Sequence, residues 1–129
     1  MKKRLFLLML VFLVGGALVT ACGGGAPKVT PTPTGPVGDP VAGKEAYDKT
    51  CITCHGPDAK GMPNLGKDLT TSQFAKSKSD AELVDFIKIG RPASDPANTV
   101  GVDMPPRGGN PALTDQDLLN IVAFVRTLE

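Results

Sequence analysis

The chain has 129 residues, with 14 lysines and arginines against 13 aspartates and glutamates. A chain of this length can hold one modest domain. The near-neutral charge balance, with one tyrosine and no tryptophan, excludes the basic and aromatic surface of a nucleic-acid-binding protein.

The N-terminus is typical of an exported protein. Lys2, Lys3 and Arg4 precede an almost unbroken apolar run from Leu5 to Leu18. This run is short for a membrane-spanning helix, and small residues follow it, as in a secretory signal. We therefore expect residues 1–21 to be a signal peptide. Its removal takes three of the 14 basic residues, so the mature chain is slightly acidic, with 11 basic and 13 acidic side chains.

The end of this signal, Val19-Thr20-Ala21-Cys22, resembles the lipobox of bacterial lipoproteins. In those proteins a diacylglyceryl group is attached to the cysteine thiol, and cleavage leaves that cysteine as the mature N-terminus. The resemblance implies a lipid-anchored protein at the cell membrane, facing the periplasm or the cell exterior. The alternatives are an uncleaved membrane anchor and simple secretion in which Cys22 has no role.

Residues 22–38 comprise Cys22 and a linker, GGGAPKVTPTPTGPVG. Its glycines, prolines and threonines provide too little apolar surface to form a core, so we expect a flexible tether. The 16 linker residues would reach about 20–24 Å as a coil and ~50 Å as an extended polyproline helix. The functional domain is then residues 39–129.

The first predicted helix of this domain begins at Asp39, a good N-cap, and Pro40 suits its first helical position. One face of the helix carries Gly43, Tyr47, Cys51 and Cys54. A glycine inside a helix costs about 1 kcal/mol relative to alanine. We therefore expect Gly43 to allow close approach of another helix; the alternative is a helix glycine with no packing role.

Two more helices are predicted further along the chain. One begins at Ser79, which forms a capping box with Glu82, and it ends at Gly90. The other begins at Thr114, and its buried stripe comprises Leu118, Ile121, Val122, Val125 and Leu128. A shorter helical turn is possible at residues 71–75. No convincing strand pattern is present, so the sequence predicts a small all-α domain with three main helices.

The segment Cys51-Ile52-Thr53-Cys54-His55 carries the most specific chemistry. Two thiols separated by two residues at a helix end project to one side, where they can add to the two vinyl groups of a haem. The adjacent imidazole of His55 is then a suitable nitrogen ligand for the iron. The segment therefore predicts one covalent haem c, which would supply most of the centre of so small a core. We expect the apoprotein to be poorly folded.

Three other uses of Cys51 and Cys54 compete with haem attachment. A disulfide is plausible in a secreted protein but would close a very small loop. A thioredoxin-like pair requires a βαβ context, which is absent from the sequence pattern. A zinc site needs about four ligands, and the domain offers only these two cysteines and His55.

The residues leave several candidates for the sixth iron ligand. The chain has one histidine, so ligation by two histidines of the chain is excluded, leaving a methionine, another side chain or an open position. Met62 lies seven residues after His55, on the chain that leaves the proximal side, and is poorly placed to reach the opposite face. Met104 lies within residues 90–111, a Gly- and Pro-rich stretch without helical periodicity, and two prolines follow it directly. We therefore expect Met104 to be the ligand; the alternative is a side chain that packs against the haem without ligation.

At this point the domain resembles the class I mono-haem cytochromes c. The resemblance covers residues 39–129 and is carried by GKEAY before CITCHG, by MPNLGKDL and by GVDMPPRGGNPALTDQDLLNIVAFVRTL. It implies that Gly43 and Tyr47 pack across Ile121 and Phe124 where the first and last helices cross. It also identifies Met104 with the family's methionine ligand.

The resemblance implies a further contact to the proximal ligand. Pro63 matches the family proline whose backbone carbonyl accepts the Nδ1 hydrogen of the ligating histidine, a bond that would fix the ring of His55 and raise its basicity. The segment GRPASDPANTVGVD before Met104 resembles haem domains attached to respiratory complexes.

The function implied is single-electron transfer between respiratory or photosynthetic membrane complexes, with His55 and Met104 as iron ligands. The expected partners are redox proteins, such as a quinol-oxidising complex, an oxidase or a reaction centre, and the lipid anchor joins the protein to the membrane. Neither catalysis nor a small-molecule substrate is expected. The alternatives are a permanent haem subunit of such a complex, a haem enzyme or sensor with an open sixth position, and a lipoprotein adhesin without cofactor.

Overall fold

The computed structural model describes residues 37–129. Its elements are α2 (Pro40–Thr50), α3 (Ile52–His55), α4 (Gln73–Lys76), α5 (Asp80–Ile89), the 3₁₀ helix η1 (Pro106–Gly109) and α6 (Asp115–Arg126). Between residues 37 and 129, extended pairing is limited to one isolated bridge that joins Arg91 and Met104. The prediction of an all-α domain with three main helices, α2, α5 and α6, is confirmed. The predicted signal peptide, Cys22 and most of the linker lie outside the described residues.

No helix in residues 37–129 combines the length and the apolar character needed to cross a bilayer.

The N-terminal caps explain where the three main helices begin. The Asp39 carboxylate accepts hydrogen bonds from the backbone of Val41 and Ala42 at the start of α2. Ser79 and Glu82 form the predicted capping box of α5. Thr114 forms a second capping box with Asp117 at the start of α6. Each cap satisfies backbone N–H groups that have no partner within the helix, so all three start sites follow from local sequence.

The capping box of α5 makes stability depend on pH. Hydrogen bonds from the backbone and hydroxyl of Ser79, together with Lys78, lower the pKa of Glu82 from 4.5 to about 2. A depressed folded pKa means that this carboxylate stabilises the fold above its unfolded pKa, and that the contribution is lost as pH falls toward the folded pKa. We therefore expect Glu82→Ala to lower the thermal denaturation midpoint most at about pH 6 and hardly at all near about pH 2.

The exposed Glu45 of α2 provides the matched control, since it forms no cap. Glu45→Ala should change the midpoint little at either pH. An effect of Glu82→Ala that stayed constant across the acid range would contradict the role assigned to the ionised carboxylate.

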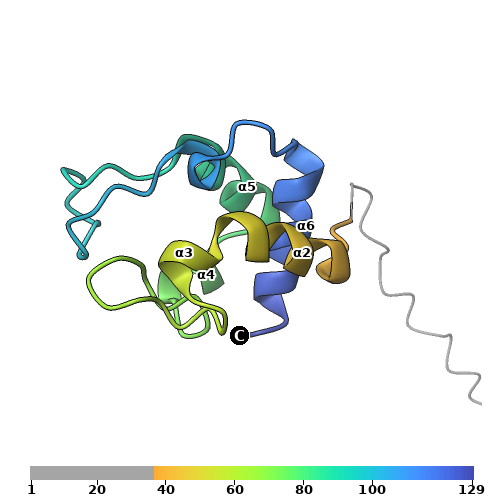
Figure 1. Cartoon of the computed structure of the whole chain (residues 1–129), viewed down its shortest axis with the longest axis horizontal. Helices are drawn as coiled ribbons and strands as arrows, with labels where there is room; N and C mark the ends of the chain where they lie inside the picture. The colour runs from red at the N-terminus through yellow and green to blue at the C-terminus, as the bar shows by residue number, and fades with distance from the viewer. Residues whose placement is uncertain (1–36) are drawn as a thin grey trace, which may run out of the picture. The chain divides into compact units, whose positions relative to one another are not determined.

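Helices α2 and α6 cross in direct contact (Figure 1). Gly43 lies at the crossing, where a Cβ atom would collide with the backbone carbonyl of Asn120. The ring of Tyr47 packs edge-on against Phe124 with 5.3 Å between centroids. The buried Tyr47 hydroxyl donates to the carbonyl of Gly56, 2.7 Å away, and so ties α2 to the end of α3. The predicted packing of the first and last helices is confirmed.

Helix α5 also packs against α6, and α2, α5 and α6 all contribute residues to the buried core. Its largest fully buried side chains are Tyr47, Leu118 and Val122. Two loops extend from the helices and lie on one side of them: the His55 loop (residues 56–72) and the Met104 loop (residues 90–105) (Figure 1). The short helix α4, predicted as a turn at residues 71–75, leads from the first of these loops toward α5.

Candidate functional site

The two thiols lie where one helix ends and the next begins. Helix α2 ends at Thr50, and the backbone N–H of Cys51 donates to Tyr47 before α3 continues from Ile52. Cys51 and Cys54 are free and half-buried, and both line one cavity. Burial, followed by the neighbouring Cys54, raises the pKa of the Cys51 thiol to about 11. The thiol is therefore protonated at neutral pH and is compatible with an apolar cavity.

The cavity has a volume of about 540 Å³, within the range of roughly 300–1,000 Å³ found for cofactor sites. Its apolar lining includes Leu83, Ile87, Leu118, Ile121, Val122 and Val125. His55 and Met104 also line it, together with the two thiols. A site with two free thiols, one imidazole and one thioether around a large apolar space fits a covalent haem, because each attachment or ligation group faces the space that the macrocycle requires.

The ring of His55 is oriented by a backbone carbonyl. Its Nδ1 lies 2.9 Å from the carbonyl oxygen of Lys67. A carbonyl can only accept, so Nδ1 is the donor in this contact, and in the neutral ring the lone pair of Nε2 is then available to a metal. The prediction that the carbonyl of Pro63 is the acceptor was wrong. The carbonyl that fixes the ring belongs to a residue four positions later.

The path of the His55 loop explains this correction. The backbone of Gly61 and Met62 donates to the carbonyls of His55 and Cys54, which holds Pro63 at the end of α3. The chain then turns, with Gly66 donating to Met62. Gly66 lies so close to the carbonyl of Cys54 that a Cβ atom would collide with it. This close approach, which only glycine permits, brings the carbonyl of Lys67 beside the imidazole.

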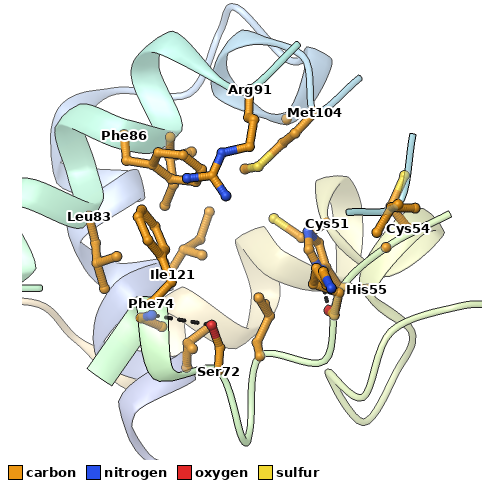
Figure 2. Close-up of a pocket in the computed structure, with 18 of the residues that line it drawn as sticks. Cys51, Cys54, His55, Ser72, Phe74, Leu83, Phe86, Arg91, Met104 and Ile121 are labelled. Atoms are coloured by element: carbon orange, nitrogen blue, oxygen red, sulfur yellow. Dashed lines mark hydrogen bonds between the residues drawn. The ribbon is translucent and has the colours of Figure 1, made fainter. Parts of the chain in front are cut away.

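Met104 is held by its backbone. Arg91 and Met104 exchange two N–H···O hydrogen bonds of 2.8 Å, which closes the Met104 loop at its base. Gly90 precedes this pair with φ +75°, and a Cβ atom there would collide with the carbonyl of Met104. Figure 2 shows Met104 and Arg91 on one wall of the cavity and Cys51, Cys54 and His55 on another, with the Met104 sulfur directed inward. Met62, in contrast, is 43% exposed and does not line the cavity.

Polar side chains form hydrogen bonds within the Met104 loop and next to it. Asn98 bonds to the carbonyls of Pro92 and Val102 and accepts from two backbone N–H groups of the loop tip. Arg107, just beyond the loop, bonds to Asp115 at the start of α6, and Asp115 also pairs with Lys88 of α5. These bonds connect the tip of the loop to its two sides and the segment after it to α5 and α6.

Sequence reasoning missed two contributors to the site. The Lys67 acceptor is a backbone carbonyl, which leaves no signal in residue identity. Arg91 lines the cavity with a side chain that is only 19% exposed. In the sequence, Arg91 stands out only as a charged residue between a helix-ending glycine and Pro92. Charged residues in loops are usually solvated, so this position did not suggest a buried side chain.

Comparison with known proteins places the domain in one family. Residues 40–129 match the family model described as cytochrome c. Cytochrome c-555 of Chlorobaculum thiosulfatiphilum is 33% identical over 87 residues, covering 67% of this chain and 93% of that protein. Cytochrome c-551 of Bacillus subtilis is 39% identical over 96 residues, covering 70% of this chain and 79% of that protein.

A third relative is larger than this chain. The cbb3-type cytochrome c oxidase subunit CcoP of Rhodobacter capsulatus is 28% identical over 89 residues, covering 68% of this chain but only 29% of that subunit. No solved structure matches significantly.

Proposed function

Because the chain belongs to the cytochrome c family, we propose that it is a membrane-tethered carrier of single electrons whose haem iron is ligated by His55 and Met104. Electron transfer and covalent haem binding follow from membership of the family itself. The protein transfers electrons and is not an enzyme, and it binds haem c covalently through the CxxCH motif of Cys51, Cys54 and His55.

One observation carries the proposed ligation: His55 and Met104 line the same apolar cavity as the two attachment thiols. When bound, the haem supplies an iron that gains and loses one electron. The chain holds each ligand from its backbone, His55 through the Lys67 carbonyl and Met104 through its paired hydrogen bonds with Arg91. Ligands fixed in this way favour electron transfer, because little of the protein has to move when the iron changes charge.

The apolar lining of the cavity supports the same function. Leu83, Ile121 and Val122 give the site buried apolar walls, and an apolar surrounding lowers the local dielectric and disfavours the more positively charged oxidised iron. A thioether ligand shifts the potential in the same direction. Together these features suit a carrier of relatively high potential.

The tether is part of the proposal. The lipobox-like segment ending at Cys22 and the linker after it support attachment of the haem domain to the outer surface of a bacterial membrane. A tether raises the effective concentration of a domain near partners in the same membrane. The proposed partners are therefore membrane redox complexes, namely a quinol-oxidising complex, an oxidase or a reaction centre.

A second candidate function is favoured by one relative. The similarity to the oxidase subunit CcoP supports a chain that stays bound to one respiratory complex as a permanent haem subunit. Purification of the full chain in mild detergent tests this candidate. Stoichiometric co-elution with large membrane subunits would show that the chain is a permanent subunit. Elution as a small haem protein would instead support the mobile carrier.

The anchor is tested by Cys22→Ser in the full chain. We expect the wild-type protein to incorporate labelled fatty acid and the variant to incorporate none, because the variant lacks the thiol that would carry lipid. The absorption spectrum and midpoint potential should be the same for both, since Cys22 lies outside the haem domain. Equal labelling of the two proteins, or labelling of neither, would contradict lipid attachment at Cys22.

A further inference from the structure

Arg91 places a positive charge in the haem cavity. It follows Gly90 directly after α5, and its side chain is 19% exposed and lines the cavity. Figure 2 shows the guanidinium directed into the pocket beside Met104 and Phe86. A cation in so apolar a space is costly unless anionic or polar groups compensate it.

The protein compensates this cation only partly. The guanidinium carbon lies 4.5 Å from the ring centre of Phe74 and 4.8 Å from that of Phe86, both within cation–π range. Nε is 3.2 Å from a carboxylate oxygen of Asp95 but is not directed at it, so this buried N–H forms no hydrogen bond. The remaining contact is a long hydrogen bond of 3.4 Å to the carbonyl of Ala97.

The other two arginines of the described domain are better satisfied. Arg107 forms hydrogen bonds of 2.7 and 2.8 Å to Leu113 and Asp115. Arg126 bonds to two backbone carbonyls and two carboxylates, which tie the α4–α5 connection and the C-terminus to α6. The Arg91 side chain, in contrast, forms a single long hydrogen bond, leaves its Nε–H without an acceptor and directs its guanidinium into the cavity. An arginine fork with unused donors is a strong receptor for a carboxylate.

We propose that Arg91 binds a propionate carboxylate of the haem and that its positive charge favours the reduced iron. Haem c has two such carboxylates, so the cofactor supplies the anion that the protein lacks at this position. Oxidation adds one positive charge in the same cavity, and a buried guanidinium opposes that charge. Asp95 acts with the opposite sign, because its carboxylate offsets part of the Arg91 charge. The proposal rests on haem c occupying this cavity and does not depend on the lipid anchor.

Two matched variants of the full holoprotein test this role, Arg91→Gln and Asp95→Asn. We expect Arg91→Gln to lower the midpoint potential at neutral pH and to shift the propionate bending frequency in the resonance Raman spectrum. Asp95→Asn should raise the potential, because it removes the charge that opposes Arg91. These opposite signs separate an electrostatic role from a structural one, since loss of a contact that only holds the Met104 loop would lower the potential in both variants.

An unchanged potential in Arg91→Gln, or an equal fall in both variants, would overturn the proposal. A lower potential without a Raman shift would overturn the carboxylate contact. If Arg91→Gln loses the long-wavelength band of ferric sulfur ligation, the potential of Arg91→Lys is measured instead. A potential near that of the wild type supports the role of the positive charge, and a potential equal to that of Arg91→Gln overturns the proposal. Failure of His/Met ligation is distinguishable, because that band would then be missing from the wild-type protein as well.

Discussion

Replacing Met104 with alanine is expected to cause the largest change in redox behaviour of any single substitution. The long-wavelength band of ferric sulfur ligation should disappear, the midpoint potential should fall, and the iron should bind added imidazole. The reason is that a thioether ligand raises haem potentials, and axial ligands tune them over about 0.8 V across proteins. Spectroelectrochemical titration and imidazole titration of the full holoprotein measure these three effects.

Met62→Ala is the matched control. Met62 is the other methionine of the described domain and lies outside the cavity with 43% of its surface exposed. Its removal should leave the spectrum and potential unchanged. If Met104→Ala behaved like Met62→Ala, the iron would have some other sixth ligand or an open position, and the proposed ligation would be wrong.

Removing both attachment thiols is expected to have the largest effect on folding. Without haem, the cavity of about 540 Å³ would be empty. At about 24 cal/mol per Å³ of cavity, this void would cost on the order of 10 kcal/mol if it stayed closed and dry, which is close to the whole stability of a small domain. We expect Cys51→Ala/Cys54→Ala, prepared free of haem, to show weak helical circular dichroism and rapid proteolysis.

Cys22→Ser serves as the cysteine control, because it removes a thiol from outside the haem domain. It should retain haem, helical signal and resistance to protease. A haem-free double variant that unfolded cooperatively at the wild-type temperature would show that α2, α5 and α6 form a sufficient core by themselves, contrary to this expectation.

Local sequence determined the starts of the helices and the identity of the attachment site. Asp39, Ser79 and Thr114 are caps whose side chains bond to backbone groups within three residues, so their effect does not depend on the rest of the fold. The CxxCH spacing is equally local, since the five residues from Cys51 to His55 place both thiols beside the imidazole. These features were predicted correctly because the interacting groups are close along the chain.

Long-range contacts decided the rest. The carbonyl that orients His55 belongs to Lys67 rather than Pro63, because the close approach of Gly66 to Cys54 sets the path of the intervening loop. The Arg91 cation lies in the cavity because its backbone pairs with Met104, thirteen positions later, and its guanidinium packs on two aromatic rings. Backbone acceptors and the burial of a single charge depend on how distant segments meet in space. The sequence alone therefore determined the attachment chemistry of this protein, and tertiary packing determined which groups orient His55 and place a charge in the cavity.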